Sequence, residues 1–226
     1  MSASREMEAG LDRYHGEAGQ AYFSWQNQAG DDRGRVNARK FASLVSPDHA
    51  VLDFGCGGGE LLNHLHAREK LGVEVNETAR AHAASLGIET VGTLAEVTDA
   101  WADRIVSNHA LEHVPDPFHV LQELHRCLKP GGLLALCLPI DDWWRERTWT
   151  ADDINGHLYA WTPLLLGNLL SATGFEIRKI WVFTHAWPPR FYLFDRALPV
   201  WAFDALCTVI SVVRRRRQLM AVAGRP

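Results

Sequence analysis

Between residues 51 and 65 the sequence reads VLDFGCGGGELLNHL, in which Asp53, Gly55, Gly57 and Gly59 form the pattern D-x-G-x-G-x-G. Glycine carries no Cβ, so a turn built from alternate glycines bends sharply and brings its backbone close to a ligand. An apolar run precedes the turn, and a segment able to form a helix follows it. In α/β proteins, nucleotide-like ligands bind at such a junction. We therefore interpret the turn as part of a ligand site.

Nearby acids indicate which ligand this turn suits. A dinucleotide fingerprint, G-x-G-x-x-G, needs a glycine where this sequence has Glu60, and a carboxylate there repels a pyrophosphate. Asp53 adds to that repulsion and favours a cationic group instead. Glu74 follows the first glycine by about twenty residues, where an acid can accept hydrogen bonds from ribose hydroxyls. A nucleoside with a cationic group and no phosphate describes S-adenosylmethionine.

The sequence HALEH at residues 109–113 matches the H-x-x-E-H pattern of one class of zinc peptidases. Such a site needs a helix that holds its two histidines on one face. Here an apolar run ends at Asn108, and Pro115 follows almost at once. Because too little helix remains, we expect no metal ion, and we expect Glu112 and His113 to hold the loop in place.

Apolar runs of strand length recur along the chain and alternate with helical patterns. The runs occupy residues 50–54, 71–75, 88–91, 102–108 and 132–139. The helical patterns occupy residues 60–69, 77–86 and 117–128. Strands that are apolar on both faces and alternate with helices predict a parallel sheet covered on both sides. The predicted fold class is therefore α/β, with a doubly wound, mostly parallel sheet.

The segments outside this alternation are expected to complete one domain over residues 1–226. A helix over residues 162–174, a strand over 175–184 and a short last strand over 218–226 are predicted. The mostly apolar residues 190–217 are interpreted as a helical insertion over the active site. Residues 1–45 form either a helical lid or helices packed on the sheet edge. The side chains that such a lid would bring over the ligand are Tyr14, Tyr22, Trp25 and Arg33.

Five blocks occur in order between about residues 45 and 184: VLDFGCGGGELLNHL, GVEVNETAR, IVSNHALEHVPDP, LQELHRCLKPGGLLALCLP and HLYAWTPLLLGNLLSATGFEI. Together they resemble the successive motifs of class I S-adenosylmethionine-dependent methyltransferases of the small-molecule type. The ordered set is far more specific than any one block. The resemblance implies a Rossmann-like sheet of seven strands whose last strand is antiparallel.

The resemblance also implies which residues contact S-adenosylmethionine. They lie in the turn, after the second strand and after the fourth strand, and the predicted set is Asp53, Gly55, Cys56, Gly57, Glu74, Val75, Leu94, Asn108 and His109. One departure concerns the adenine ring. The family often places an acid after the third strand, where this sequence reads GTLAEV, so adenine recognition is expected to use backbone groups and Leu94.

Methyl transfer from a sulfonium is an in-line displacement that requires alignment and exclusion of water, without a covalent intermediate or a metal. A hydroxyl acceptor benefits from a base that removes its proton. His157 lies beyond the fifth strand on the expected ligand side and is the predicted base or substrate contact, although a capping or packing role is equally ordinary. Asp141 and Asp142, directly after that strand, are the alternative bases.

Composition restricts the partners and the location. The net charge is −4, and Lys and Arg are scattered over most of the chain, which argues against nucleic-acid binding. Four well-separated cysteines without a C-x-x-C pair favour free thiols in a reducing, cytoplasmic setting. The apolar residues 191–217 end in four arginines, which favours contact with the inner face of a membrane. A homodimer contact or a helix folded onto the domain is the alternative.

Taken together, the sequence predicts an S-adenosylmethionine-dependent methyltransferase that acts on a small molecule. A hydroxyl on a sugar, a lipid-linked compound or a secondary metabolite is the expected acceptor, because the aromatic loop near residue 143 and the apolar residues 190–217 suit a sizeable, partly apolar substrate. The alternative is a non-catalytic module of the same fold that binds the cofactor or a partner.

Overall fold

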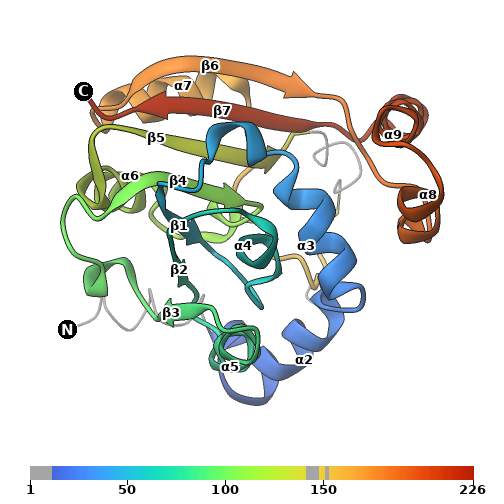
Figure 1. The fold of residues 1–226 in the computed structure, drawn as a ribbon, viewed down its shortest axis with the longest axis horizontal. Coiled ribbons are helices and arrows are strands. Elements are labelled where there is room, and N and C mark those ends of the chain that lie inside the picture. The colour runs from blue at the N-terminus through green and yellow to red at the C-terminus, as the bar shows by residue number, and fades with distance from the viewer. Residues whose placement is uncertain (1–11, 141–147, 151–152) are drawn as a thin grey trace.

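One sheet organises the fold in a computed structural model that describes residues 12–140, 148–150 and 153–226 (Figure 1). Within these residues, seven strands lie in the order β3-β2-β1-β4-β5-β7-β6. Strands β1 to β5 pair in parallel, whereas β7 is antiparallel to both β5 and β6. The bounds are β1 (Ala50–Phe54), β2 (Glu69–Val73), β3 (Glu89–Val91), β4 (Ala102–Asn108), β5 (Leu128–Pro139), β6 (Glu176–Phe183) and β7 (Gln218–Gly224). The predicted fold class, with its antiparallel last strand and the helical insertion before it, is confirmed.

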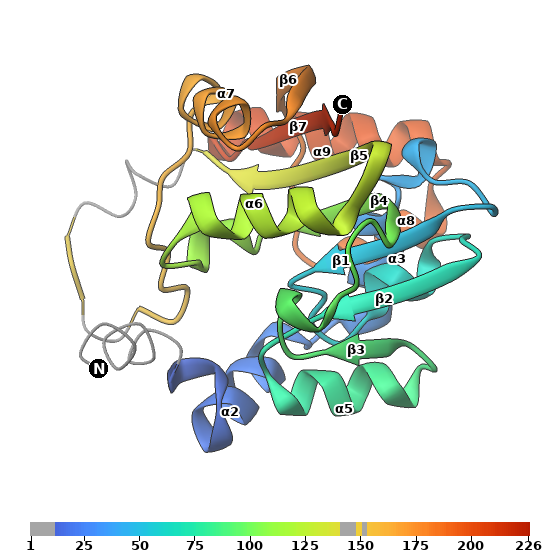
Figure 2. The same ribbon diagram turned by 90° about the vertical axis from the view of Figure 1, so that its left-hand side faces the viewer.

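Helices cover both faces of the sheet (Figures 1 and 2). The longer helices are α2 (Gly16–Gln26), α3 (Gly30–Ala38), α4 (Glu60–His64), α5 (Glu77–Ser85), α6 (Pro117–Cys127), α7 (Pro163–Ala172), α8 (Phe191–Ala197) and α9 (Val200–Arg214). On one face α3, α4 and α5 pack on a core that includes Phe41, Leu62 and Val106. On the other face, α6 and α7 pack on a larger core that includes Leu124 and Leu170. Apolar residues on both faces of the strands make both layers possible.

Helix α4 is shorter than the helical pattern predicts. It ends at His64 rather than at residue 69, because Leu65 is extended, with φ −84° and ψ 139°, and only 2% exposed. Burying that leucine directs the chain away from the helix and into β2, which begins at Glu69. The predicted start of the second strand at residue 71 is therefore two residues late.

Strand β5 is longer than predicted, since it begins at Leu128 rather than at residue 132. Leu128 pairs with Ala102 of β4, and the next pair joins Leu133 to Arg104, so the register shifts between them. The Lys-Pro-Gly-Gly segment, which indicates a turn in the sequence, is accommodated in this irregularity, where Gly131 has a φ of +77°.

The ligand-binding edge of the sheet is the one at which the parallel strands end. The chain leaves β1, β2, β4, β5 and β6 at this edge, and α3, α8 and α9 gather beside it (Figure 1). Helices α8 and α9 form the connection between β6 and β7. In the described part of the chain, no helix combines the length and the apolar character that crossing a bilayer would need.

A close contact fixes α3 against the start of α4. A Cβ added at Gly34 would lie 2.5 Å from Glu60 Cβ and 2.6 Å from the Glu60 carbonyl carbon, so glycine is the residue that fits. Gly167 of α7 is a useful contrast, because its added Cβ would be 3.4 Å from Ile180 Cδ1, an ordinary contact.

We expect Gly34→Ala to lower the free energy of unfolding by about 1–3 kcal/mol, because the methyl group meets backbone that cannot move aside cheaply. Gly167→Ala should leave that free energy unchanged or raise it by roughly 0.5–1 kcal/mol, since alanine is the better helix former. Urea unfolding followed by circular dichroism measures both variants. Equal effects of the two substitutions would contradict the proposed contact.

Candidate functional site

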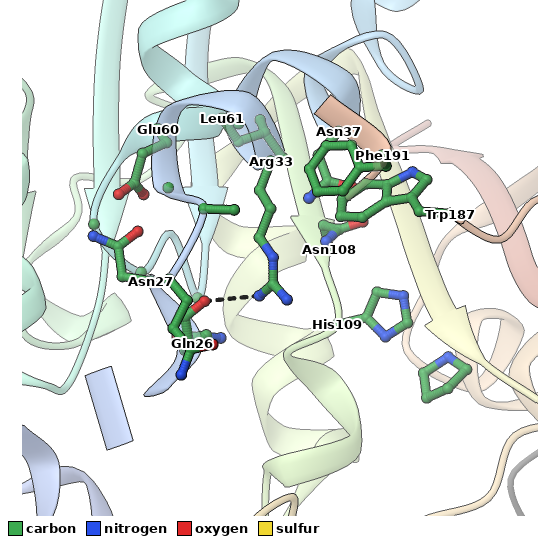
Figure 3. A pocket seen from close by; sticks show the side chains of 18 of the residues that line it. Gln26, Asn27, Arg33, Asn37, Glu60, Leu61, Asn108, His109, Trp187 and Phe191 are labelled. Carbon is green, nitrogen blue, oxygen red and sulfur yellow. Dashed lines mark hydrogen bonds between the residues drawn. The ribbon is translucent and has the colours of Figure 1, made fainter. Parts of the chain in front are cut away.

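A cavity of about 910 Å³ opens at the carboxyl edge of the sheet. Its walls come from the glycine turn after β1, from α2 and α3, from the segment after β4, and from the residues around α8 and the end of α9. Figure 3 shows Arg33 reaching into this space from α3, with Glu60 and Asn27 at one end and Trp187 and Phe191 at the other. Segments far apart in the sequence therefore enclose one site.

The glycine turn has the left-handed backbone that its composition allows. Gly55 has a φ of +72° and Gly57 a φ of +54°. The Gly55 N–H donates to the Val73 carbonyl at 2.9 Å, which anchors the turn to β2. A Cβ added at Gly55 would lie 2.4 Å from Ala110 Cβ, whereas at Gly57 the nearest atom would be Gln26 Oε1 at 3.9 Å. The backbone at Gly57 thus faces open space in which a ligand can approach closely.

Glu74 holds this turn from behind. Its Oε2 accepts the Gly57 N–H at 2.9 Å, and its Oε1 accepts the Asn76 N–H at 2.9 Å. Burial raises the pKa of Glu74, although the hydrogen bonds from the Asn76 and Gly57 N–H groups oppose that rise. The carboxylate therefore shapes the turn, and its oxygens have further lone pairs for ribose hydroxyls.

The buried carboxyl group of Asp53 indicates which kind of ligand suits this cavity. Its side chain lines the cavity, the residue is 2% exposed, and its Oδ1 accepts no hydrogen bond from the described residues. Burial and the nearby Glu74 carboxylate raise the pKa of Asp53 well above its ordinary value. A buried carboxyl without a partner is costly, and a cationic ligand group supplies that partner. The sulfonium nucleoside expected from the sequence fits this requirement.

Glu60 makes the same end of the cavity unfavourable for phosphate. Its carboxylate stands at the first position of α4, and its Oε1 lies 3.2 Å from His82 Nε2. A carboxylate at this position competes with any anion for the helix N-terminus. The geometry therefore agrees with the prediction that the turn does not bind a diphosphate.

His109 follows β4 and adopts a strained backbone, with a φ of +58°. Its Nδ1 lies 3.2 Å from Glu112 Oε1. Burial disfavours the charged imidazole, but interactions with Cys137 and Glu112 outweigh burial and raise the pKa of His109 to about 9. The His109 interaction also contributes to a lowered pKa at Glu112 in spite of burial. These two residues form an ion pair in the cavity wall.

Three side chains converge beside this pair. Glu112, His113 and His157 each offer one ligand atom, and these atoms lie within 4.8 Å of one another, so the three could hold a metal ion. The rings of His113 and His157 also contact each other, with centroids 5.0 Å apart. Burial lowers the pKa of His113, which favours the neutral imidazole, the form that binds a metal. The 3-10 turn Leu111–His113 is only three residues long, as expected for this segment.

Most residues predicted for the site lie around one cavity. Seven of them line it: Asp53, Gly55, Cys56, Gly57, Asn108, His109 and His157. Glu74 stands behind the turn, and Val75 follows it with a half-buried side chain. Leu94 is 7% exposed and belongs to the hydrophobic core, apart from the cavity lining. Asp141 and Asp142 lie outside the described residues.

Several lining residues have no counterpart among the predicted cofactor and catalytic residues. Asn37 and Lys40 come from the end of α3 and the segment after it, and Trp187, Arg190 and Phe191 come from the segment after β6. Arg190 and Phe191 belong to residues 190–217, which are expected over the active site from the sequence. Trp187 lies just before that segment, and the rule that ligands bind beyond the carboxyl ends of strands could have indicated it as well. The sequence around Asn37 and Lys40 carries no motif that marks a site.

Comparison with known proteins gives one family match over most of the chain. The model of a methyltransferase domain family matches residues 25–180. The ubiquinone biosynthesis O-methyltransferase of Vibrio cholerae is 40% identical over 95 residues, which are 36% of this chain and 38% of that protein. That of Pseudomonas aeruginosa is 36% identical over 98 residues, 38% of this chain and 42% of that protein. The matched segment thus spans less than half of these relatives.

Solved structures share the fold at low identity. An S-adenosylmethionine-dependent methyltransferase from Archaeoglobus fulgidus has a TM-score of 0.62 and 18% identity, over 90% of this chain and 99% of that chain. Phosphoethanolamine N-methyltransferase 2 of Haemonchus contortus, in complex with S-adenosyl-L-methionine, has a TM-score of 0.61 and 17% identity, over 96% and 59%. At this identity the likeness concerns the fold alone.

The raised pKa of Asp53 predicts that binding of a cationic ligand is linked to proton release. A cation favours the ionised carboxylate, so Asp53 gives up its proton on binding S-adenosylmethionine wherever the unliganded carboxyl is protonated. The apparent binding enthalpy, measured by calorimetry in phosphate and in an amine buffer, should therefore differ between buffers. Asp53→Asn should weaken binding and remove this difference, whereas the exposed control Asp48→Asn should change neither. Identical enthalpies in both buffers would count against the assignment.

Proposed function

The chain belongs to the methyltransferase domain family, and from this premise we propose that it transfers a methyl group from S-adenosylmethionine to a hydroxyl of a small molecule. The family predicted from the sequence is confirmed by the match over residues 25–180. The observation that carries the proposal is the buried carboxyl of Asp53, which needs a cationic partner beside the open backbone of Gly57.

At the cofactor end, residues of the chain are proposed to bind and orient S-adenosylmethionine. The cofactor supplies an activated methyl group when it is bound. Asp53 offers a carboxylate to a cationic group, the Gly57 backbone allows close approach, and Glu74 keeps the turn in shape for the ribose. Val75 and Leu94 are proposed to border the nucleoside. The His109–Glu112 ion pair is nearly neutral overall, so it adds little repulsion against a sulfonium.

At the acceptor end, His157 is the proposed general base. It lines the cavity and contacts the neutral ring of His113, so a proton taken from an acceptor hydroxyl stays within a polar cluster. Removing that proton as the methyl group is transferred increases the nucleophilicity of the oxygen. Asp141 and Asp142 stay alternative bases. Oxygen as the methylated atom is supported by the O-methyltransferases among the relatives.

The acceptor is proposed to be a sizeable molecule of the sugar, lipid-linked or secondary-metabolite type. Trp187 and Phe191 stack with ring centroids 4.4 Å apart and form an aromatic wall of the cavity. Helices α2 and α3, together with the α8–α9 segment, are proposed to close over the bound molecules and exclude water. The alternative, a non-catalytic module of the same fold, predicts cofactor binding without methyl transfer.

The outward face of α9 supports a second proposal, contact with the inner face of a membrane. Trp201 is 75% exposed, Val212 63% and Val213 74%, so one side of this helix presents apolar groups to solvent. Arginines follow directly from Arg214 to Arg217. An exposed apolar helix face next to several arginines is typical of proteins that lie on anionic lipid surfaces. We propose a cytoplasmic location, peripheral to the inner face of a membrane, and a homodimer through the same face is the alternative.

We expect the protein to bind S-adenosylhomocysteine and to transfer a labelled methyl group from S-adenosylmethionine to at least one compound in pooled extracts or a panel of hydroxylated molecules. His157→Ala should lower kcat by about 10²–10⁴-fold, because it removes a general base, while the affinity for S-adenosylhomocysteine stays within about twofold. His119→Ala, at an exposed histidine on α6, is the control. Cofactor binding by the wild type without transfer to any compound would favour the non-catalytic alternative.

The membrane proposal predicts sedimentation with vesicles that contain phosphatidylglycerol and little sedimentation with pure phosphatidylcholine. The double variant Trp201→Glu/Val212→Glu should lose this binding, because it places charge on the apolar face. Leu164→Glu is the matched control, since Leu164 is 74% exposed on α7. If the double variant instead abolishes a concentration-dependent dimer in analytical ultracentrifugation, and the wild type ignores vesicles, the face is a homodimer contact.

A further inference from the structure

We infer that the acceptor carries a phosphate or diphosphate group, which Arg33, Arg190 and Arg216 bind. This inference rests on the proposed function, since it names the class of molecule that receives the methyl group. It concerns side chains that the cofactor end does not use.

The acidic and basic side chains that line the cavity come from different elements. Asp53 and Glu60 lie at the cofactor end, and Glu112 is paired with His109. In contrast, Arg33, Arg190 and Arg216 come from α3, the start of α8 and the segment after α9. Arg33 donates to the Gln26 carbonyl at 2.7 Å, which fixes the side chain without neutralising it. Among the residues that the structure describes, no carboxylate lies within ion-pair distance of these three arginines.

Two neighbouring arginines, one on α3 and one directly after it, form ion pairs with carboxylates. Arg35 pairs with Asp195 and Asp32, and Arg39 pairs with Asp195, so carboxylates are available in this region. They lie outside the cavity lining and leave Arg33 uncompensated. Desolvation, and to a smaller extent the positive charge of Arg216, lower the pKa of Arg33, so the two guanidinium groups repel each other. An oxyanion between them would turn this repulsion into two favourable contacts.

Two further groups agree with an anionic acceptor. Lys40 lines the same cavity, and its Nζ contacts the neutral side chains of Asn108 at 2.9 Å and Gln218 at 2.8 Å. Trp187 Nε1 is buried and has no acceptor among the described residues, so an oxygen of the ligand can accept its hydrogen bond. The Trp187 ring, stacked on Phe191, can pack against the organic part next to the anion.

Guanidinium forks match phosphate oxygens in geometry, and several of them favour a group with more than one negative charge. A single carboxylate would leave most of this charge uncompensated. Diphosphate occurs both in nucleotide-linked sugars and in lipid-linked compounds, and the cavity chemistry is the same for both. The structure therefore assigns the anion, and the experiment distinguishes the two sources.

The test uses the full-length protein saturated with S-adenosylhomocysteine, so that the cofactor end is occupied. Calorimetry at constant ionic strength measures binding of inorganic pyrophosphate, of uridine diphosphate and of farnesyl diphosphate. We expect pyrophosphate to bind, and Arg33→Gln and Arg216→Gln each to weaken it by about tenfold or more. Tighter binding of uridine diphosphate than of pyrophosphate indicates a nucleotide-linked acceptor, and tighter binding of farnesyl diphosphate indicates a lipid-linked one.

Matched variants keep this test interpretable. Arg178→Gln removes an exposed arginine of β6 outside the cavity and should bind pyrophosphate like the wild type. Arg216→Lys retains the charge and should restore part of the affinity lost in Arg216→Gln, and thermal unfolding checks that each variant is folded. Absence of pyrophosphate binding, or equal binding by Arg33→Gln, Arg216→Gln and the wild type, overturns the inference. If the wild type also fails to bind S-adenosylhomocysteine, the proposed function fails with it; intact cofactor binding confines the failure to the anion.

Discussion

The carboxylate of Glu74 connects the elements on which the cofactor end depends. It accepts N–H groups from Gly57 in the turn and from Asn76 at the start of α5. The Asn76 side chain caps α5 by accepting from Thr78 and Ala79, and it donates to the Gly19 carbonyl of α2 at 2.8 Å. Glu74 and Asn76 therefore join the glycine turn after β1, the end of β2, the start of α5 and the N-terminal helix α2. The shape of the glycine turn is set by this network as much as by its glycines.

The charge distribution in the cavity follows from which elements supply each wall. Carboxylates come from Asp53 in β1, from Glu60 at the start of α4 and from Glu112 after β4, which is paired with His109. Basic residues come from α3, where Figure 3 shows Arg33, and from the segments around α8 and α9. Carboxylates and guanidinium groups that line one cavity favour two ligand groups of opposite charge bound beside each other.

The sheet and the cofactor end could be predicted because their signals are local. Buried parallel strands such as β1 are apolar on both faces, and the turn after β1 combines four glycines with a preceding acid, a pattern that points to a ligand. The end of α4 could not be predicted, since the burial of Leu65 depends on its neighbours in space rather than on helix propensity. The early start of β5 could not be predicted either, because Gly131 and Gly132 indicate a turn. The grouping of Arg33, Trp187 and Arg216 could not be predicted. Arg33 is expected only as one side chain of a lid and Arg216 only as part of residues 190–217, and no motif connects these segments with Trp187.

Helices α8 and α9 form an insertion between β6 and β7, two strands that pair with each other along nearly their whole length. β7 pairs with β5 and with β6 over seven residue pairs each, so the sheet closes independently of what lies between residues 184 and 217. The entropy cost of a longer connection grows only slowly with its length. A segment exchanged for this one would have to cover Val36 and pair with Arg35 and Arg39, because α8 and α9 pack on α3 through these contacts. In proteins built this way, the preference for an acceptor can diverge faster than the use of the cofactor. Grafting the segment between β6 and β7 offers a route to changing that preference.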